Sequence, residues 1–319
     1  MSISSNVEKL IVNDEQIENY FAERDLTEHT KIKSPSNYAE DVLEYFKNDM
    51  TGGVPLPFDF TEDKFKIRKG ETTIVSGYSG HGKTIWLSYV MYKALNYSKV
   101  LIASFEMLPK ATLGRMLQQT GNYEPTDNAV YDFVESLDNK LYLYDAEGET
   151  SVEKVLSVIY YAKEKLGIDM FVIDSLMKCG INEDDYNGQK RFVNQLCVAS
   201  RDLGIHIFLV AHSRKTVHEH SEPSKFDVLG SSNITNLADN CITVFRNKKK
   251  EEILSGNDED KIEEVKKHYD CKIYINKQRH GNGYEGNFGL YFDKKTLTFG
   301  VYNNDNSKPI YQANEKSFF

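Results

Sequence analysis

A glycine-rich segment of the form G-x-x-x-x-G-K-[ST] constrains this chain more than any other feature. Residues 77–84 read GYSGHGKT. The β-rich run 71–76 comes before this segment, and the helix-forming run 85–94 follows it. A strand, a glycine-rich turn and a helix aim backbone N–H groups and a helix N-terminus at a bound anion. A chance match in an ordinary glycine turn would not need these flanks, so the sequence predicts a site for a nucleoside triphosphate.

The loop residues have separate roles in such a site. Its glycines allow a tight turn and a close backbone approach to the phosphates. Lys83 supplies a point charge for the β- and γ-phosphates, and Thr84 supplies a hydroxyl for Mg²⁺. We therefore expect ATP or another nucleoside triphosphate, together with Mg²⁺, at this loop. The residues expected to hold the nucleotide are Gly77, Ser79, Gly80, His81, Gly82, Lys83 and Thr84.

The composition is that of a globular chain, long enough for one large α/β domain and an appendage. Of its 319 residues, 40% are hydrophobic and 27% are charged. No apolar run approaches the roughly 18 residues that a membrane span needs, and residues 1–9 have no apolar signal core. We therefore expect a cytoplasmic protein without a membrane partner. The four cysteines are widely spaced and are expected to be free thiols: Cys179, Cys197, Cys241 and Cys271.

The net charge of −9 argues weakly against a nucleic-acid partner. It does not exclude one, because a ring protein can be acidic outside and basic in a narrow channel. Local basic clusters therefore matter more than the total, and they occur at residues 190–191, 214–215 and 248–250. For each cluster a solvated surface is at least as good an explanation.

Expected strands alternate with expected helices from about residue 65 onwards. The strands are expected at 72–76, 99–104, 140–144, 169–173, 206–210 and 241–245, and the helices at 83–96, 110–120, 151–166 and 188–203. Short apolar runs such as 168–174 are typical of strands buried on both faces of a parallel sheet. The predicted class is α/β, with a mainly parallel central sheet flanked by helices and ligand chemistry at the carboxyl ends of the strands.

Three segments are expected along the chain: an arm at 1–55, an α/β domain at 56–302 and a mobile tail at 303–319. The arm has two weak helical patterns, at 12–21 and 38–46, and we expect it to pack on the core or on a neighbouring subunit. Within the domain, a charged and partly helical insertion is expected at 248–268. A β-hairpin marked by glycines is expected at 270–301.

Two carboxylates and a histidine follow expected strands near the loop. Asp174 is placed to hold Mg²⁺ directly or through water, although an aspartate at a strand end is also a common helix cap. Glu106 is placed to orient and deprotonate an attacking water, or it opens a helix as a solvent-exposed residue. His212 is placed to contact the γ-phosphate and report hydrolysis to the next loop, unless its role is structural.

Lys277 and Arg279 alternate on an expected strand, so both side chains point to one face. Such a Lys-x-Arg pair suits an arginine finger, which stabilises the charge on a phosphoryl group during its transfer. Basic residues on an edge strand are also ordinary, because they discourage pairing between edges.

Seven segments taken together resemble the hexameric replicative helicases of the DnaB superfamily, and most closely the Twinkle and bacteriophage helicase-primase branch. They are GYSGHGKT at 77–84, SFEM at 104–107, FVIDSL at 171–176, VAHSRK at 210–215, LGSSNITNLADN at 229–240, VFRN at 244–247 and KQRHGNG at 277–283. They occur in the family order and span most of the chain after residue 76. The loop alone is generic, whereas the ordered set with its Lys-x-Arg segment is specific.

The resemblance implies a RecA-type core that assembles as a ring, with ATP between subunits. The residues acting from one subunit would be Lys83, Thr84, Glu106, Asp174 and His212. Lys277 and Arg279 would reach in from the neighbouring subunit. Arg246 and Phe292 correspond to an arginine and an aromatic residue placed around the nucleotide base, where stacking would suit any base.

The resemblance also implies that single-stranded DNA passes through the ring, held by loops at 178–190 and 213–229. The candidates for phosphate contacts are Arg214, Lys215, Lys190 and Lys225. Two departures from the family pattern concern DNA: residues 183–185 are acidic, and the stretch 230–239 has no arginine.

The implied function is an ATP-driven, 5′-to-3′ DNA helicase of phage replication. It would act as a homo-oligomer, expected to be a hexamer, on single-stranded and forked DNA. The sequence contains no primase domain or zinc module, so a separate primase and polymerase are expected as partners. The alternatives are a RecA- or KaiC-type ATPase that is not a helicase, and a non-catalytic scaffold with the same fold.

Overall fold

The computed structural model of the chain describes residues 34–47, 52–145, 150–182, 184–212, 232–302 and 309–311. The helical pattern predicted at 12–21 lies outside the described residues. So do three of the candidate DNA-binding residues, Arg214, Lys215 and Lys225. No helix in the described ranges is long and apolar enough to cross a membrane.

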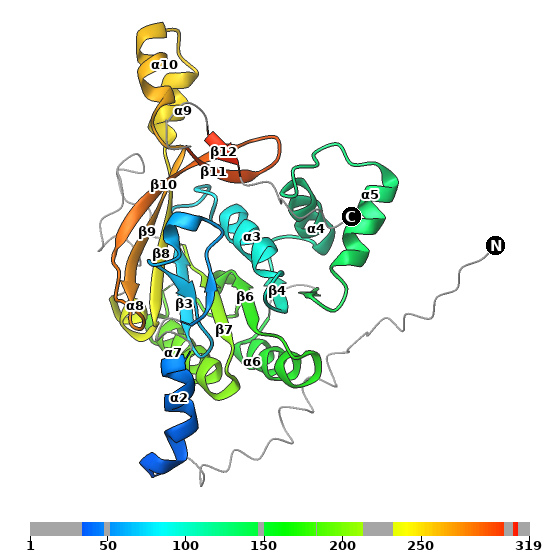
Figure 1. The fold of residues 1–319 in the computed structure, drawn as a ribbon, viewed down its shortest axis with the longest axis vertical. Helices are drawn as coiled ribbons and strands as arrows, with labels where there is room; N and C mark the ends of the chain where they lie inside the picture. Colours follow the sequence, from blue (N-terminus) through cyan, green and yellow to red (C-terminus); the bar gives the residue numbers. More distant parts are fainter. Residues whose placement is uncertain are drawn as a thin grey trace, which may run out of the picture.

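A ten-stranded sheet forms the centre of the described part of the chain (Figure 1). The strand order is β12-β11-β10-β9-β8-β3-β7-β6-β4-β5. The strands from β8 to β5 run parallel, and β9 to β12 are added antiparallel. Their bounds are β3 Thr72–Ser76, β4 Val100–Ser104, β5 Leu141–Tyr144, β6 Met170–Asp174, β7 His206–Val210, β8 Asn240–Arg246, β9 Cys271–Gln278, β10 Gly286–Asp293, β11 Thr298–Tyr302 and β12 Pro309–Tyr311. The predicted α/β class with a mainly parallel sheet is confirmed.

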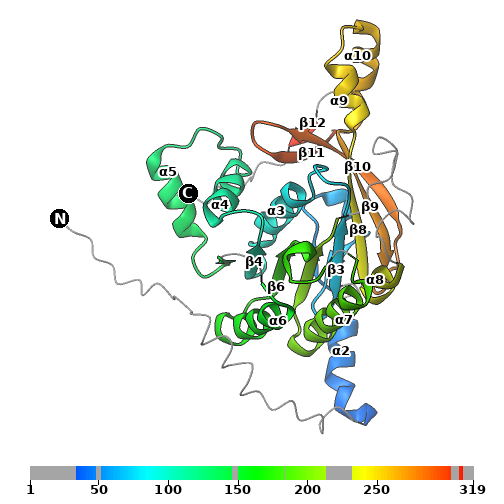
Figure 2. The same cartoon turned by 180° about the vertical axis from the view of Figure 1, so that it is seen from behind.

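Helices cover both faces of this sheet (Figures 1 and 2). Their bounds are α2 Ala39–Lys47, α3 Lys83–Ala94, α4 Pro109–Gln118, α5 Asp127–Ser136, α6 Val152–Tyr161, α7 Tyr186–Leu203, α8 Ser232–Leu237, α9 Lys248–Leu254 and α10 Glu259–Lys266. The π-helical turn Ala162–Leu166 continues α6. The short elements are the strand pair β1 Val54–Pro55 and β2 Lys66–Ile67 and the 3₁₀ turns Pro35–Tyr38, Asp59–Thr61 and Leu176–Lys178.

Successive side chains of each parallel strand point to opposite faces, so the strands supply two apolar clusters. Val75 and Phe208 belong to the cluster that α3 covers. Ile74 and Ile207 belong to the cluster that α6 and α7 cover. Burial on both faces explains why the strands read as short, nearly continuous apolar runs.

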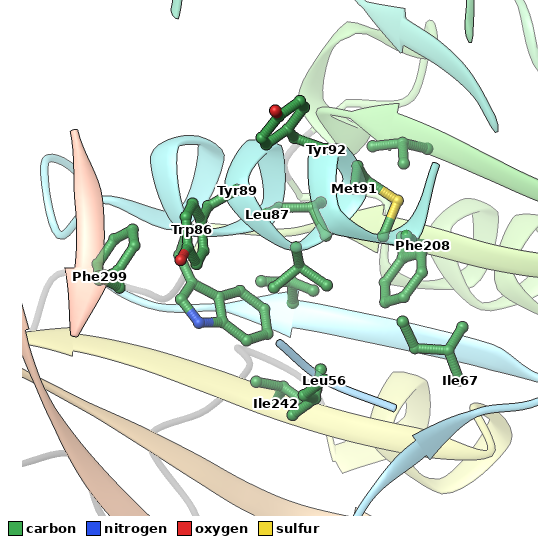
Figure 3. Close-up of a cluster of buried hydrophobic side chains, with 14 of the residues drawn as sticks. Leu56, Ile67, Trp86, Leu87, Tyr89, Met91, Tyr92, Phe208, Ile242 and Phe299 are labelled. Atoms are coloured by element: carbon green, nitrogen blue, oxygen red, sulfur yellow. The ribbon is translucent and has the colours of Figure 1, made fainter. Parts of the chain in front are cut away.

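The cluster under α3 holds the phosphate-binding loop against the sheet (Figure 3). Trp86 and Tyr89 of α3 are fully buried. They pack in one cluster with Phe208 of β7, Ile242 of β8 and Phe299 of β11, and the rings of Tyr89 and Phe299 lie 5.6 Å apart. Because α3 begins at Lys83, this packing fixes the end of the loop relative to the strand that precedes it.

Helix α5 was missing from the predicted elements. The hydroxyl of Thr126 accepts a hydrogen bond from the Ala129 N–H and caps the helix. Phe133 is buried in the cluster under α3, and Leu137 follows it there one turn later. This spacing is a helical signal that the sequence already contained. Helix α8 was also not predicted, since its six residues are too few for a clear period.

The C-terminal part of the sheet extends the predicted hairpin. Strands β9 and β10 form that hairpin, and β11 continues it as a third antiparallel strand. The insertion predicted at 248–268 contains α9 and α10, which project beyond the sheet at the end opposite to α2 (Figure 1). Within the segment predicted as a mobile tail, β12 pairs with β11. The arm's second helical pattern corresponds to α2.

All four cysteines lie in the described ranges and are free and buried. Burial raises the pKa of the Cys179 and Cys241 thiols to about 12. Thiols of this kind are inert packing groups rather than nucleophiles.

His206 is a buried polar residue at the start of β7. Its Nδ1 lies 2.6 Å from the carbonyl oxygen of Arg68, and its Nε2 lies 2.9 Å from the Thr73 hydroxyl. A neutral imidazole satisfies both contacts, donating to the carbonyl and accepting from the hydroxyl. Burial lowers the pKa of His206 to about 4.

We expect His206 to make the free energy of unfolding depend on pH. The unfolded chain, with a histidine pKa near 6.5, takes up a proton that the folded chain rejects until about pH 4. The stabilisation is therefore complete above pH 6.5 and is lost as the pH falls toward 4, by about 2 kcal/mol between pH 7.5 and 5. Denaturant unfolding should show this loss for the wild type and a smaller one for His206→Gln. The exposed-histidine control His268→Gln should behave like the wild type; an equal loss in His206→Gln would contradict the assignment.

Candidate nucleotide site at the carboxyl edge of the sheet

The loop between β3 and α3 has the backbone of an anion-binding turn. Gly80 and Gly82 have φ angles of 75° and 84°, which favour glycine. A Cβ atom at Gly77 would collide with the carbonyl oxygen of Val244 on β8, so only glycine allows this approach. The predicted glycine roles therefore agree with the geometry, and the loop opens directly into the N-terminus of α3.

Lys83 places its ammonium group inside the loop. Its Nζ donates hydrogen bonds to the carbonyl oxygens of Gly77 and Tyr78, at 2.9 and 3.0 Å, and lies 3.4 Å from Nδ1 of His212. Burial lowers the pKa of Lys83 to about 8, against the opposing effect of Asp174 and Glu106. A bound phosphate would supply the negative charge that this ammonium needs.

Asp174 and Thr84 supply a donor set that fits Mg²⁺. Asp174 ends β6 and is buried, and its Oδ1 has no hydrogen-bond partner among the described residues. The Thr84 hydroxyl bonds to the same carboxylate. Burial raises the pKa of Asp174, and the nearby Glu106 carboxylate adds to the rise. A buried, incompletely satisfied carboxylate beside a hydroxyl has the oxygen ligands that Mg²⁺ prefers, and a cation would favour its ionised form.

Glu106 and His212 lie next to these groups, as predicted. Oε1 of Glu106 accepts a hydrogen bond of 2.8 Å from the Ser175 hydroxyl. The same oxygen lies 3.6 Å from Nε2 of His212, whose other ring nitrogen faces Lys83. The Ser175 hydroxyl thus orients the carboxylate beside the His212 ring, at two neighbouring strand ends, in the position predicted for a general base.

Arg246 and Phe292 reach the same edge of the sheet. The Arg246 backbone N–H donates to Nδ1 of His81, and its guanidinium donates to the carbonyl oxygen of Gly80 at 3.2 Å. Glu251 of α9 accepts two hydrogen bonds of 2.7 Å from this guanidinium. Phe292 lies near the end of β10, 5.1 Å from the ring of Phe299.

Lys277 and Arg279 lie at the opposite end of the sheet, where the parallel strands begin. Strand β9 is antiparallel to β8, and Gln278 pairs with Asn240 at the start of β8, whereas the loop follows the end of β3. The five residues of β3 separate the two edges by on the order of 15 Å. The structure therefore does not bring Lys277 and Arg279 to the Lys83 of the same chain.

Lys190, where the predicted loop 178–190 and the predicted helix 188–203 overlapped, lies on α7. The helix begins at Tyr186, because the Asp185 side chain accepts a hydrogen bond from the Gly188 N–H and caps it. The Lys190 residue is exposed. As a candidate for contact with DNA phosphates, Lys190 therefore projects from the first turns of a helix that follows the acidic residues 184–185.

Comparison with known proteins shows the family of the chain. The family described as DnaB-like helicase C terminal domain matches residues 61–301. The chain belongs to this family. The match runs from the 3₁₀ turn before β2 to β11, so it includes the carboxyl ends of the parallel strands and the opposite end of the sheet, where Lys277 and Arg279 lie. The resemblance carried by the seven ordered segments is confirmed.

Two curated relatives belong to the predicted branch. The chain is 24% identical over 223 residues to the Twinkle homolog protein, chloroplastic/mitochondrial, of Arabidopsis thaliana, which covers 61% of this chain and 31% of that protein. It is 24% identical over 206 residues to the DNA helicase/primase of Enterobacteria phage T3, covering 56% and 36%. The chain thus spans about a third of the length of these relatives.

Solved structures agree on the fold. A DnaB-like replicative helicase, described with its interactions with primase, superposes with a TM-score of 0.65 at 17% identity, over 84% of this chain and 67% of that one. A second solved structure, described as an ATPase domain, superposes with a TM-score of 0.68 at 18% identity, over 84% and 98%. The RecA-like core predicted for this DnaB-like chain is confirmed.

Sequence reasoning missed several residues of the DnaB-like site. Ser175 follows Asp174 directly and could have been found from that position. Arg115 of α4 was not singled out, although it lines a cavity of about 20 Å³ together with Thr84 and Asp174. Burial lowers the pKa of Arg115, and the nearby Asp174 carboxylate opposes this. Glu251 was not singled out because it lies in the charged insertion, where the residues beside it are also charged.

Glu251→Gln should weaken nucleotide binding by the DnaB-like site. The two charge-assisted hydrogen bonds raise the pKa of Arg246 and lower that of Glu251, so the pair holds the guanidinium in one orientation over the loop. Losing this should raise the Kd of a fluorescent ATP analogue about fivefold, since roughly 1 kcal/mol is at stake. Glu259→Gln, on α10, is the matched control and should leave the Kd unchanged. An unchanged Kd for Glu251→Gln would mean that Arg246 is oriented without it.

Proposed function

We propose that the chain is an ATP-driven, ring-shaped helicase that translocates 5′ to 3′ on single-stranded DNA and unwinds duplex DNA in phage replication. The family match supports the class, and the relative from Enterobacteria phage T3 is named a DNA helicase/primase. One observation carries the proposal most directly. The loop with Lys83 follows the carboxyl ends of the parallel strands, whereas Lys277 and Arg279 lie at the other end of the same sheet. A complete site therefore requires a second subunit.

Each residue at the carboxyl edge has a role in hydrolysis of ATP to ADP and phosphate. Thr84 and Asp174 would hold Mg²⁺, which supplies charge neutralisation at the phosphate oxygens. Lys83 neutralises the β- and γ-phosphates from inside the loop. Glu106 takes a proton from the attacking water, whose oxygen bonds to the γ-phosphorus as the bond to the ADP oxygen breaks. Ser175 fixes the Glu106 carboxylate for this step.

The neighbouring subunit would complete the transition state. In this proposal Arg279 of the partner subunit donates to the γ-phosphoryl oxygens, and Lys277 of the partner subunit adds charge. His212 bridges Lys83 and Glu106 in the resting chain. It is therefore placed to respond when a phosphate displaces the carbonyl oxygens that now bind Lys83, and to pass that change to the segment after it.

Helix α2 offers a means of joining subunits into a hexamer. Its apolar side chains Val42, Leu43 and Phe46 are exposed, the last by 63%. A groove of about 690 Å³ runs between α4 and α5, and its lining includes the apolar side chains of Leu113 and Val134. We assign α2 of one copy to this groove of the next copy, because contiguous exposed apolar surface of this kind is covered in stable proteins.

Single-stranded DNA would lie in the channel of this ring. Its phosphates would contact Arg214, Lys215, Lys225 and Lys190, the four basic candidates. A separate primase and polymerase would complete replication, and the solved DnaB-like relative is described with its interactions with primase.

The test is ATP hydrolysis with and without single-stranded DNA, measured beside strand displacement on a forked duplex. Stimulated hydrolysis together with unwinding from a 5′ tail is the expected result. Stimulation without unwinding on any fork would favour a recombinase-type ATPase instead. Hydrolysis that ignores DNA would favour a switch-type ATPase of the KaiC kind and would overturn the helicase proposal.

A further inference from the structure

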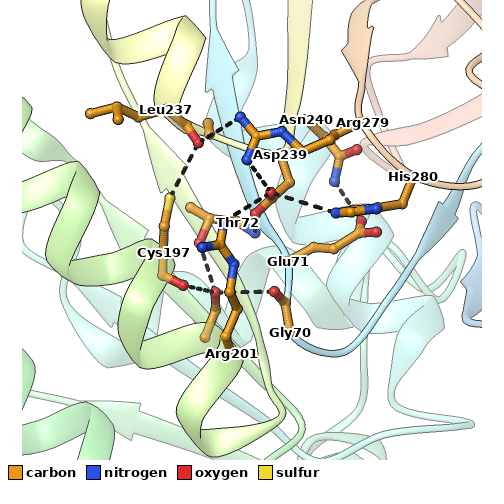
Figure 4. A network of polar contacts seen from close by, with 12 residues as sticks. Gly70, Glu71, Thr72, Cys197, Arg201, Leu237, Asp239, Asn240, Arg279 and His280 are labelled. Atoms are coloured by element: carbon orange, nitrogen blue, oxygen red, sulfur yellow. Dashed lines mark hydrogen bonds and ion pairs between the residues drawn. The ribbon is translucent and has the colours of Figure 1, made fainter. Parts of the chain in front are cut away.

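Asp239 is a fully buried carboxylate between α8 and β8 (Figure 4). Its Oδ2 accepts a hydrogen bond of 3.0 Å from the backbone N–H of Thr72. Its Oδ1 lies 3.0 Å from Nη1 of Arg279 and 3.4 Å from Nη2 of Arg201. His280 lies further away, at 3.9 Å. A buried carboxylate is costly unless cations and N–H groups satisfy it, so these contacts are strongly favoured.

The contacts of Asp239 do more than neutralise Arg279. Nη2 of the same guanidinium donates to the carbonyl oxygens of Asn236 and Leu237, at 2.9 and 3.3 Å. Three of the five N–H groups are therefore engaged by Asn236 and Leu237 at the end of α8 and by Asp239 just after it. The Nε–H and one Nη1–H make no hydrogen bond to a described residue, and the side chain remains 37% exposed.

This arrangement suits a group that must act on a neighbouring molecule. An arginine has several rotatable bonds, and its planar fork recognises phosphate only in a limited range of orientations. Asp239 is also held by the Thr72 N–H of β3 and by Arg201 of α7. A carboxylate held in this way orients the Arg279 guanidinium before the phosphate arrives. Lys277 is held in the same region by the carbonyl oxygens of Thr235 and Ala238.

We propose that Asp239 is the positioning residue for Arg279. The inference rests on the proposed function, in which Arg279 acts on the nucleotide of the adjacent subunit. Asp239 contacts no phosphate and acts only through Arg279. Because it also binds the backbone of Thr72, it connects the finger to β3, the strand whose other end carries the subunit's own loop.

Asp239→Asn tests the proposal, since asparagine keeps the shape of the aspartate side chain and removes the negative charge that holds the Arg279 guanidinium. We expect kcat for ATP to fall on the order of tenfold to a hundredfold, less than for removal of the finger itself, with KM for ATP within about threefold. Arg201→Gln is the matched control: it removes the other cation on Asp239 and should leave kcat within about twofold. If Asp239 served mainly to tie α7 to the sheet, Arg201→Gln would lower kcat to a similar degree.

Mixing subunits separates positioning in trans from damage to the subunit's own site. Asp239→Asn subunits have an intact loop, and Lys83→Ala subunits have an intact finger. Mixed oligomers should therefore recover turnover if Asp239 acts through Arg279, and an absence of recovery at all ratios would overturn the proposal. Should Asp239→Asn fail to assemble, the double variant Asp239→Asn/Arg201→Gln restores the charge balance and serves in the same mixture.

The outcome also separates this inference from the proposed function. If Arg279→Ala recovers on mixing with Lys83→Ala but Asp239→Asn keeps full turnover alone, the finger acts in trans and Asp239 does not position it. If Arg279→Ala itself keeps full turnover, the proposed function fails at the shared site and the inference fails with it.

Discussion

Arg279→Ala should lower ATP turnover by the assembled chain about 10³-fold or more while the nucleotide still binds. The reason is geometric: Arg279 lies across the sheet from Lys83 of its own chain. In the proposed ring, its loss therefore removes charge from the transition state in the adjacent subunit's site and leaves the subunit's own loop intact. The measurement is steady-state hydrolysis beside the Kd of a fluorescent ATP analogue. An increase in Kd that accounts for the whole loss would contradict a role in the transition state.

Mixtures of Arg279→Ala with Lys83→Ala provide the control for this prediction. Each variant alone should be inactive, because every site contains one defect. In a mixed ring some sites combine an intact loop with an intact finger, and turnover should return with a maximum at intermediate ratios. A flat, inactive series would mean that the finger and the loop belong to one chain, against the distance between the two edges.

Glu106→Gln should lower kcat by about 10²- to 10⁴-fold with little change in nucleotide affinity. Glutamine has the shape of glutamate and can still accept the hydrogen bond from the Ser175 hydroxyl, but it cannot take a proton from water. Single-turnover hydrolysis with excess enzyme isolates this chemical step from product release.

Ser175→Ala is the graded companion of that variant. It leaves the carboxylate and its contact with His212 in place and removes only the hydroxyl that orients Oε1. We expect a loss on the order of tenfold, the value of one positioning hydrogen bond to a charged group. A larger loss for Ser175→Ala than for Glu106→Gln would mean that Glu106 is not the base.

The sequence predicted the sheet because the information for buried parallel strands is local. Runs such as 170–174 and 206–210 are almost wholly apolar, since both of their faces are covered. Two helices were not predicted, one with an overlooked signal and one with a weak one. Helix α5 carried a readable period that was missed, and α8 is too short to have one. The predicted loop 178–190 and the predicted helix 188–203 overlapped at Lys190, and the structure begins the helix earlier, at Tyr186, because Asp185 caps it.

The candidate site divides in the same way. Lys83, Thr84 and Asp174 could be named because their roles follow from a motif and from a strand end. Ser175 and Glu251 were not predicted as site residues, because each one acts through a contact in the folded chain. Ser175 donates to Oε1 of Glu106, and Glu251 accepts from the guanidinium of Arg246. No spacing in the chain specifies either contact.

By itself, the sequence determined most of the strands and helices of this protein and which residues are proposed to bind phosphate, because apolar periodicity, glycine turns and helix starts depend on neighbouring residues. Only the tertiary structure decided which residues face one another. Asp239 meets the backbone of Thr72 across 167 positions because β8 lies beside β3, and it meets Arg279 because β9 turns back along β8. The same pairing puts Arg279 at the end of the sheet away from the loop with Lys83, since antiparallel addition reverses the direction of the strand.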